Sequence, residues 1–522
     1  MRFATVLLCV FFCVGAPASS APTKGGLSLD ALLERARAAS GEPYRYHVVS
    51  VSRETHDGRA FEVTTETDGL KYRARSCSKA LCTGFYFDGE RSYDANFNQT
   101  ALPLSSRVDA LQLTLRAIVS YAFAAPNFRA QGGQLLEREP VLREGRSYRR
   151  LAVAPFRGAL LDAVVDPVTG LVAGVVSDER HYAFELRDQR RVGGKLMLPY
   201  TIALNGAVVE RFDTRAIASA PLEAPAGLVP TIASDAAPVT FVKHDRPSDP
   251  PIVACTIGNT TTTCLLDTGN SGLSMDLAFA KKLGLSPRGG AFEIGGVGRF
   301  VAGLAVAPPL TVAGATYPRA QYVVLNDLHQ YGYDVVLGAD AFAHARVTID
   351  FAAHRVAIGP ESQAAVPSKA ARRIPIVFDN FVPLAQVSFG SSVISLAIDT
   401  GDVGSITVSR AFASDHPESF AADRSATTDV LGHVARTRFG TGATAELDNV
   451  PIRATKDIAD TAKGHIGTAF LALSHESMTF DYTHNRIEFG PSDMLDSDRS
   501  AAPAQKPASR PRPNPTSTGT GE

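Results

Sequence analysis

Two Asp-Thr-Gly triplets lie 132 residues apart, and they are the residues whose types and spacing could do chemistry. They are Asp267-Thr268-Gly269 and Asp399-Thr400-Gly401. If two such carboxylates lie close together they cannot both ionise, so the pair shares one proton. One carboxyl can then act as general base on a water molecule while the other polarises a carbonyl group. Such a pair could hydrolyse an amide bond without a metal ion or a covalent intermediate.

The sequence around the two triplets is repeated. Residues 251–269 align without a gap with residues 383–401. Downstream, residues 348–360 match residues 479–491 at an offset of 131. Two matched ends at nearly the same offset indicate duplicated lobes, because chance does not readily produce both. The predicted lobes are 238–361 and 373–491.

Each triplet follows an apolar strand, so each carboxylate is predicted on a turn that leaves a core strand. In the first lobe, Val253–Ile257 and Thr262–Leu266 predict a hairpin with its turn at Gly258–Thr261. Cys255 and Cys264 would then lie across from each other. The residues aligned with them in the second lobe are apolar, namely Val387 and Leu396. A disulfide in place of an apolar cross-strand pair is consistent with the repeat.

Four cysteines remain once an N-terminal targeting segment is removed, namely Cys77, Cys82, Cys255 and Cys264. An even count in an exported chain favours disulfides, and the spacing predicts two local bridges, Cys77–Cys82 and Cys255–Cys264. A metal site is the competing interpretation, but no Cys-x-x-Cys pair or paired histidines accompany these cysteines. We therefore predict no metal site.

The N-terminus has the composition of a secretory signal peptide. A basic residue, Arg2, precedes an apolar run over Val6–Val14, and Ala16–Ala18 supplies a cleavage site of small residues. We predict a signal peptide at 1–20 and an exported protein, periplasmic or secreted. No later stretch approaches the roughly 18 apolar residues of a spanning helix, so no transmembrane segment is expected after signal removal.

Composition excludes further classes of protein function. The 522 residues carry a net charge of −1, with 45% hydrophobic and 20% charged residues. That balance argues against a nucleic-acid binder, and the chain contains no HExxH, P-loop or GxSxG motif. The Pro-rich end at 492–522 has the composition of a disordered tail. The segments 218–237 and 362–372 are predicted linkers.

The first half of the chain has no acid–base or metal constellation. Residues 28–217 predict an α+β accessory domain with one mostly antiparallel sheet, a helix at 28–39 and another at 108–123. Segments such as 85–89 and 166–170 resemble the periplasmic lipoprotein-carrier type of fold. That resemblance implies a half-barrel able to hold an apolar ligand or an acyl chain. The alternative is a domain that positions substrate or shields the cleft.

The two lobes resemble two-lobed aspartic proteases of the pepsin and retropepsin type over residues 240–490. In that family each lobe also carries an apolar-apolar-Gly strand behind the catalytic loop. The matching residues are Val336, Leu337 and Gly338 in the first lobe and Ile466 and Gly467 in the second. The resemblance implies a mainly β fold with a double-lobed β-barrel domain. It makes Asp267 and Asp399 the catalytic dyad, oriented by the Thr and Gly residues of the triplets.

The same resemblance implies a protein or peptide substrate and no cofactor. Because both triplets lie in one chain, a monomer is sufficient to build the dyad. A glycine-rich segment resembles the family's flap but lacks the tyrosine that the flap carries. The segment contains Gly295, Gly296, Val297 and Gly298.

The residues next to the proposed dyad depart from the family pattern. Asn270 and Asp402 follow the triplets, where the family usually has a small residue, and His465 replaces an apolar residue. We expect Asp402 to be exposed and inert. We expect His465 to be buried and hydrogen-bonded rather than catalytic.

We therefore expect an exported aspartic endopeptidase. Activity should favour mildly acidic pH, because one carboxyl of the dyad must keep its proton. The alternative is a non-catalytic envelope protein that binds a lipid or a peptide and uses the protease-like lobes as a scaffold. Peptide cleavage by the wild type, compared with Asp267→Ala, distinguishes the two.

Overall fold

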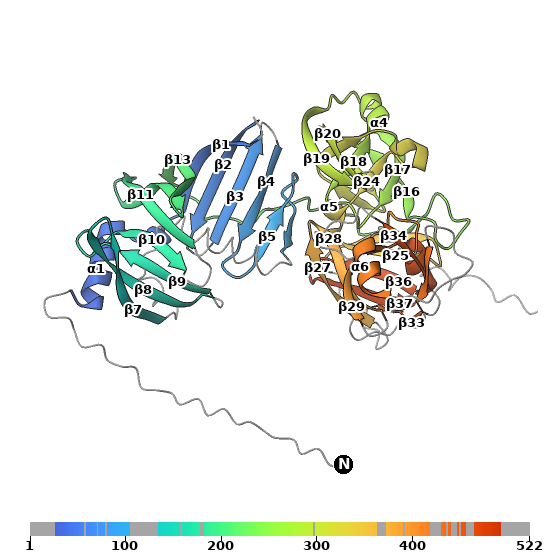
Figure 1. The fold of residues 1–522 in the computed structure, drawn as a ribbon. Coiled ribbons are helices and arrows are strands. Elements are labelled where there is room, and N and C mark those ends of the chain that lie inside the picture. Colours follow the sequence, from blue (N-terminus) through green and yellow to red (C-terminus); the bar gives the residue numbers. More distant parts are fainter. Residues whose placement is uncertain are drawn as a thin grey trace, which may run out of the picture. The chain divides into compact units, whose positions relative to one another are not determined.

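The computed structural model describes residues 27–491 except 57–58, 70, 79–80, 105–133, 157–158, 178–181, 296–297, 363–371, 390–391, 418–429, 435–436, 440–445, 448–449, 456–463 and 475. The predicted signal peptide, the predicted helix at 108–123, most of the linker at 362–372 and the predicted tail lie outside the described residues. The described chain is mainly β, as predicted (Figure 1). None of its helices has the length and apolar character needed to cross a membrane.

The chain forms two compact units. The first takes in the chain up to Ala224 except for two short pieces, Leu81–Thr83 and Tyr93–Ser106, which group with the second unit. The second unit also contains everything from Pro225 onward. Composition does not reveal this division, because it carries no information about which distant residues a short hairpin contacts.

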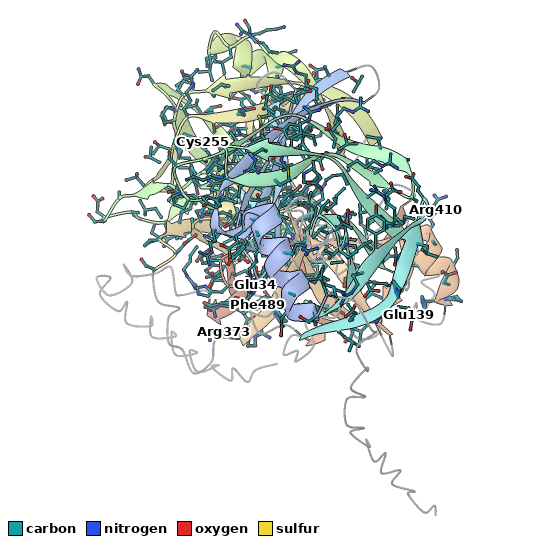
Figure 2. The ribbon with its side chains drawn as sticks, turned by 90° about the vertical axis from the view of Figure 1, so that its left-hand side faces the viewer. Glu34, Glu139, Cys255, Arg373, Arg410 and Phe489 are labelled. Atoms are coloured by element: carbon teal, nitrogen blue, oxygen red, sulfur yellow. A yellow bond between two sulfur atoms is a disulfide. The ribbon has the colours of Figure 1, made fainter. Side chains whose placement is uncertain are left out.

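One antiparallel sheet forms the first unit, in the order β4-β3-β2-β1-β13-β12-β11-β10-β9-β8-β7. Its strands are β1 (Val48–His56), β2 (Arg59–Asp68), β3 (Lys71–Ser78), β4 (Leu81–Phe87), β7 (Gln134–Arg143), β8 (Arg146–Phe156), β9 (Ala159–Val165), β10 (Val172–Ser177), β11 (Tyr182–Val192), β12 (Leu196–Leu204) and β13 (Ala207–Ile217). Figure 2 shows the side chains, with Glu34 on α1 and Glu139 on β7 labelled. The likeness of this unit to a lipoprotein carrier stays a prediction.

The helix α1 (Leu29–Ser40) confirms the helix predicted at 28–39. The hydroxyl of Ser28 accepts a hydrogen bond from the amide of Ala31, so it caps the first turn. Gly41, with φ of 74°, ends the helix in the left-handed conformation that glycine adopts most readily. The buried Leu32 and Leu33 belong to an apolar cluster whose other members lie on the strands of the sheet. A short 3-10 turn (Pro43–Arg45) leads into β1.

Two short strands from the first half of the sequence, β5 (Ser92–Ala95) and β6 (Ala101–Pro103), pair with each other as a hairpin. The segment that holds them belongs almost entirely to the second unit. Residues 96–100 form its turn, where the amide of Asn96 donates to the carbonyl of Thr100 (3.1 Å).

Lobe one of the second unit is built mainly from short strands. Its elements are β14 (Thr231–Ile232), β15 (Val239–Thr240), β16 (Ile252–Ile257), β17 (Thr260–Leu266), β18 (Leu273–Asp276), α4 (Leu277–Lys282), β19 (Arg288–Gly295), β20 (Gly298–Ala307), β21 (Leu310–Val312), β22 (Ala315–Tyr317), β23 (Ala320–Leu325), a 3-10 turn (Leu328–Tyr331), β24 (Val335–Leu337), α5 (Ala339–Phe342), β25 (Arg346–Asp350) and β26 (Arg355–Gly359). Within the predicted linker at 218–237, Leu228 is buried in the core and β14 pairs with β22.

The hairpin of β16 and β17 forms, but its predicted turn was too long. Ile257 pairs with Thr260, so the turn has two residues, and Gly258 adopts a positive φ of 57° at its first position. Cys255 pairs with Thr262 instead of Cys264, so the two cysteines are diagonal neighbours and not directly opposite as expected. They are nevertheless close enough to form the predicted disulfide, with Cα atoms 5.9 Å apart. Cys77 and Cys82 are also disulfide-bonded.

Lobe two repeats this succession of elements. They are β27 (Arg372–Asp379), β28 (Val382–Phe389), β29 (Ser392–Ile398), β30 (Ile406–Ser409), α6 (Arg410–Asp415), β31 (Val430–Val434), β32 (Thr437–Phe439), β33 (Glu446–Leu447), β34 (Val450–Thr455), β35 (Gly464–Ile466), α7 (Thr468–Leu471), a 3-10 turn (Ala472–Ser474), β36 (Glu476–Asp481) and β37 (Arg486–Pro491). As β17 does in lobe one, β29 follows a hairpin partner and leads directly to a triplet.

Strands of both lobes join in one sheet, in the order β15-β26-β25-β36-β37-β27, which we call the inter-lobe sheet. Thr348 pairs with Thr479 at its centre, and their hydroxyl oxygens lie 2.8 Å apart. These two residues are equivalent in the sequence repeat.

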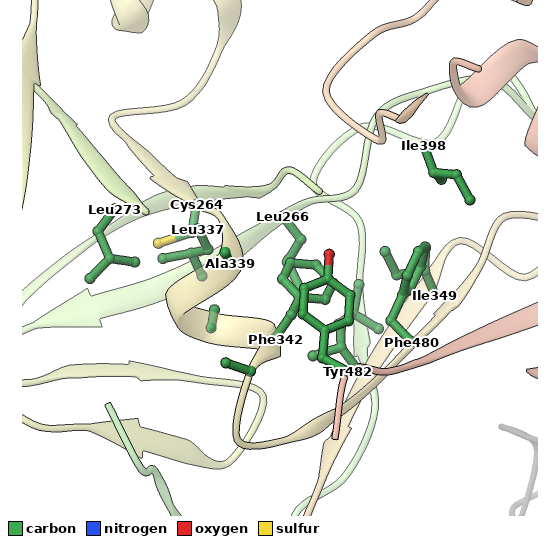
Figure 3. Packing of buried hydrophobic residues seen from close by; sticks show 14 of the residues in the cluster. Cys264, Leu266, Leu273, Leu337, Ala339, Phe342, Ile349, Ile398, Phe480 and Tyr482 are labelled. Atoms are coloured by element: carbon green, nitrogen blue, oxygen red, sulfur yellow. The ribbon is translucent and has the colours of Figure 1, made fainter. Parts of the chain in front are cut away.

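One apolar core runs through both lobes. Phe342 of lobe one stacks on Tyr482 of lobe two with ring centroids 5.5 Å apart, and it meets Phe480 edge-on at 5.5 Å (Figure 3). Leu266 and Ile398, the residues that precede the two aspartates, are fully buried in this core. The strands that carry the triplets are therefore anchored before the triplets begin.

Candidate active site

Asp267 and Asp399 follow the ends of two equivalent strands, β17 and β29. Parallel to each runs the short apolar strand predicted to lie behind it, β24 for β17 and β35 for β29. The amide of Asp267 donates to the carbonyl of Leu337 at 2.9 Å. The amide of Asp399 donates to the carbonyl of Ile466, also at 2.9 Å. The residues Val336, Leu337, Gly338, Ile466 and Gly467 thus lie where the sequence repeat places them.

The two threonines lock the triplets to each other. The hydroxyl of Thr268 accepts a hydrogen bond from the amide of Thr400 (3.1 Å) and donates one to the carbonyl of Ile398 (2.6 Å). In return, the hydroxyl of Thr400 accepts from the amide of Thr268 (3.0 Å) and donates to the carbonyl of Leu266 (2.7 Å). Both threonines are fully buried. Each therefore satisfies a backbone amide and a backbone carbonyl of the opposite lobe.

The glycine of each triplet lies against the aspartate of the other. A Cβ atom at Gly269 would lie 2.6 Å from Cγ of Asp399. A Cβ atom at Gly401 would lie 2.6 Å from Cγ of Asp267. No side chain fits at that distance, so glycine is required at both positions to let the carboxyls meet.

Backbone amides orient both carboxyl groups. The amide of Gly269 donates to Oδ1 of Asp267 at 2.8 Å. Equivalently, Oδ1 of Asp399 accepts hydrogen bonds from the amides of Gly401 (2.9 Å) and Asp402 (3.1 Å). The carboxylates are held by the main chain, which leaves each a second oxygen for the other carboxyl and for a water molecule.

The environment of Asp267 favours its protonated form. Burial raises the pKa of Asp267 well above its usual value, and the charge of Asp399 and a hydrogen bond between the two carboxyls raise it further. The amides of Gly269 and Gly401 act in the opposite direction and lower this pKa. The pair can therefore hold one proton between two carboxyls, which is the state that general acid–base chemistry on water needs.

The residues after the triplets occupy equivalent turns. The side chain of Asn270 accepts a hydrogen bond from the amide of Gly272 (3.3 Å), and that of Asp402 accepts one from the amide of Gly404 (2.8 Å). The expectation that Asp402 is exposed was wrong, whereas its inertness stays a prediction. Its side chain is only 26% exposed, and its Oδ2 atom lies 2.9 Å from Nε2 of His465.

His465 is partly buried and hydrogen-bonded, in line with the sequence-based expectation. Burial lowers the pKa of His465, but the hydrogen bond to Asp402 and the charges of Asp399 and Asp402 outweigh it. The pKa of the imidazole is therefore raised above its ordinary value. A cationic His465 compensates the additional carboxylate that Asp402 brings to the dyad.

The candidate flap is a hairpin. Strands β19 and β20 pair antiparallel up to Gly295 and Gly298. Gly296 and Val297, at its tip, lie outside the described residues. The sequence analysis did not single out Tyr333, whose pKa responds to the charges of Asp267 and Asp399. Burial is the main cause, and together with these charges it raises the pKa of Tyr333 to about 12. Its only signal in the sequence is its position two residues before the strand that leads to Gly338.

In the part of the chain that the structure describes, no three His, Cys, Asp or Glu side chains gather into a group that could hold a metal ion. The acidic groups that do meet, Asp267 and Asp399, share hydrogen bonds with each other and with backbone amides.

Comparisons with known proteins bear on the same region. Residues 253–341, which contain the first triplet and its partner strand, match the model of a family described as aspartyl protease. This match supports an aspartic-protease-like domain in the chain. Among solved structures, an aspartic proteinase from Irpex lacteus has 15% sequence identity, a TM-score of 0.36, and coverage of 50% of this chain and 98% of its own. No curated protein sequence matches the chain.

Proposed function

We propose that this protein is an exported aspartic endopeptidase that hydrolyses peptide bonds with a water molecule activated by Asp267 and Asp399. One observation carries the proposal: two equivalent loops bring two carboxyl groups into hydrogen-bonding contact, and burial and charge raise the pKa of one of them. Buried carboxyl pairs with separated proton affinities are typical of acid–base catalysis.

The roles follow from the geometry. The carboxylate that has lost its proton accepts a proton from the attacking water, and the protonated carboxyl donates a hydrogen bond to the scissile carbonyl oxygen. The proton then passes to the leaving amine. Thr268 and Thr400 keep the two loops in register, and Gly269 and Gly401 allow the carboxyls to approach. Protein or peptide substrates are what the aspartyl protease match supports.

Export is supported by chemistry that is independent of the dyad. Cys255 and Cys264 form a disulfide, and Cys77 and Cys82 are also disulfide-bonded. Disulfides persist in oxidising compartments, so they agree with the signal peptide predicted at 1–20. Protease protection in fractionated cells, measured with and without disruption of the outer envelope, would locate the protein.

The test is digestion of a peptide library between pH 3 and pH 8 by the wild type, Asp267→Asn and Asp399→Asn. A matched control is Asp235→Asn, which makes the same change at an exposed carboxylate of the same unit. We expect cleavage by the wild type and by the control, strongest at mildly acidic pH, and at least about a thousandfold loss in both dyad variants.

Two outcomes would contradict the proposal. Cleavage that survives in both dyad variants would mean that another group is catalytic. A wild type that binds peptides or lipids but cleaves nothing, even after removal of any masking segment, would favour the non-catalytic envelope protein instead.

A further inference from the structure

A short segment from the first half of the sequence lies against the catalytic loop of lobe one. This segment, residues 96–100, belongs to the same unit as the two lobes. Asn96 is 7% exposed and Thr100 is fully buried. The side-chain oxygen of Asn96 accepts hydrogen bonds from the amides of Asn98 (3.0 Å) and Thr100 (3.1 Å). The segment is therefore a rigid turn organised around the side chain of Asn96.

The segment provides the hydrogen-bond donors for a buried carboxylate in lobe one. Asp340 lies on α5, two residues after Gly338, and is fully buried. Its Oδ1 atom accepts hydrogen bonds from Nδ2 of Asn96 (2.8 Å) and from the hydroxyl of Thr100 (2.5 Å). Its Oδ2 atom accepts one from Nδ2 of Asn98 (2.6 Å). A buried carboxylate without these donors would be costly, so Asp340 fixes the segment in place.

The same amide reaches the catalytic loop. Nδ2 of Asn96 also donates to the carbonyl of Ser271 (3.1 Å), four residues after Asp267. On its other side the loop is held by two backbone amides: that of Gly338 donates to Gly272 (2.8 Å) and that of Ala339 donates to Asn270 (2.9 Å). Asn96 is thus the side chain that joins the loop to its buried anchor.

Among the residues of lobe two that the structure describes, there is no equivalent arrangement. The residue aligned with Asp340 after the Gly of the partner strand is Ala469, which has no carboxylate to receive such donors. Its loop is held by the amides of Thr468 and Ala469, which donate to Asp402 (2.7 Å) and Gly404 (3.0 Å). In the described part of the chain, the donors of segment 96–100 therefore serve the Asp267 loop and not the Asp399 loop.

We propose that Asn96 is a positioning residue for the dyad and that the segment 96–100 holds the catalytic loop of the protease-like unit in place. This inference rests on the proposed function for its kinetic consequence. The hydrogen bonds of the Asn96 side chain in the described structure do not go to Asp267 or Asp399; Asn96 acts through the carbonyl of Ser271 on the turn that carries Asp267. A displacement of that turn by a fraction of an ångström would misplace the carboxyl relative to its partner and slow the chemical step.

The test compares Asn96→Ala with Asn98→Ala in the full-length chain. Both variants remove one amide that donates to Asp340, but the other contacts of the Asn98 side chain go to the backbone of Gln321 and not to the catalytic loop. We expect both to lower the melting temperature by similar amounts. Only Asn96→Ala should lower kcat, by about tenfold or more, with KM changed less than twofold. Equal losses of kcat in the two variants, or none in Asn96→Ala, would overturn the inference.

A second variant distinguishes the loss of the Asn96 donor from a general loss of stability. Asn96→Asp keeps the oxygen that accepts from the amides of the turn but replaces the donor with a second acceptor. Its deficit in kcat relative to the wild type should shrink as the pH falls, because the introduced carboxyl can donate a hydrogen bond once it is protonated. A deficit that is constant with pH would contradict the role of the donor.

Hydrogen exchange separates this inference from the proposed function. In Asn96→Ala, but not in Asn98→Ala, the amides of residues 269–272 should exchange at least about tenfold faster than in the wild type. This readout does not require turnover. If the wild type cleaves nothing but the exchange differs as stated, the proposed function fails and the positioning of the loop stands; if exchange is the same in both variants, the inference fails.

Discussion

Nε2 of His465 lies 2.9 Å from Oδ2 of Asp402, directly beside the second triplet. The equivalent pair in lobe one is Val336 and Asn270, which carry no charge. At these equivalent positions, lobe two therefore has an ionisable pair and lobe one has none. Burial lowers the pKa of His465, but the hydrogen bond to Asp402 and the charges of Asp399 and Asp402 outweigh this effect. The folded protein therefore binds the imidazole proton more tightly than the unfolded chain does.

We predict that this pair stabilises the fold most at acidic pH. A histidine whose pKa is raised on folding contributes its full stabilisation below its unfolded pKa, about 6.5, and loses it as the pH rises through the folded pKa. His465→Gln should therefore lose more stability relative to the wild type at pH 5.5 than at pH 9, as measured by urea unfolding. In an Asp402→Asn background this dependence on pH should weaken. Equal losses at both pH values would contradict the prediction.

Replacement of Asp267 should stabilise the protein while it abolishes the proposed activity. The pKa of Asp267 is raised by burial and by Asp399, so the folded state loses stability as the pH rises from about 4 through the folded pKa. In Asp267→Asn the introduced amide would keep hydrogen bonds to the neighbouring groups without that ionisation. Thermal melts of this variant should show a higher midpoint than the wild type at pH 7.5 and no advantage at pH 3.5. The exposed Asp235→Asn should show neither effect, and a lower midpoint at pH 7.5 for Asp267→Asn would refute the argument.

The disulfide of lobe one occupies positions that are apolar in lobe two. Cys255 and Cys264 are buried, as are their equivalents Val387 and Leu396. Replacing the pair by Cys255→Val with Cys264→Leu should cost about 2 kcal/mol, because the short loop gains entropy when unfolded but the core stays filled. The double serine variant should cost more, since it buries two hydroxyls there. Chemical denaturation of both variants checks the order, and equal stabilities would contradict it.

Arg346 compensates the charges of two buried carboxylates in the inter-lobe sheet. Its guanidinium donates to Asp481 and to Glu488, each at 2.6 Å, and all three side chains are buried. Arg346→Met should destabilise the protein by about 3 kcal/mol, because two buried carboxylates lose a partner. Arg486, 3.0 Å from Asp481, keeps the loss at the lower end of the range for such pairs.

The matched control for that change is Arg190→Met in the first unit. Arg190 pairs with Asp188 on the surface, where both side chains are about half exposed. Water screens exposed ion pairs, so they contribute little to stability and this variant should unfold near the wild-type midpoint. Similar unfolding midpoints for the two variants would show that the buried Arg346 contributes no more to stability than the exposed Arg190.

The sequence was sufficient for the dyad loops because their signals are local and duplicated. The triplets, the strands before them and the partner strands at Gly338 and Gly467 all occur in both halves, and the structure places them as the repeat predicts. The hairpin of lobe one was predicted with too long a turn. Residue types alone do not distinguish a two-residue turn at Gly258 from a four-residue one when threonines follow.

Other features depend on contacts between distant residues. The sequence shows Asp402 only as a charge after a turn, and nothing local indicates that His465 comes within 2.9 Å of it. Likewise, Asn96 and Asp340 are 244 positions apart, and neither lies in a motif. Such pairs emerge from tertiary packing, which periodicity and composition do not encode.

The inter-lobe sheet also limits how a peptide would reach Asp267 and Asp399 under the proposed function. Backbone pairing between β25 and β36 ties the lobes together, and hinging them apart would break this pairing and expose the Thr348–Thr479 contact. Under the proposed function, a peptide would then be admitted and released by local displacement of loops and not by separation of the lobes. A covalent cross-link between β25 and β36 should therefore leave the turnover rate unchanged, whereas restraint of the β19–β20 hairpin should slow it.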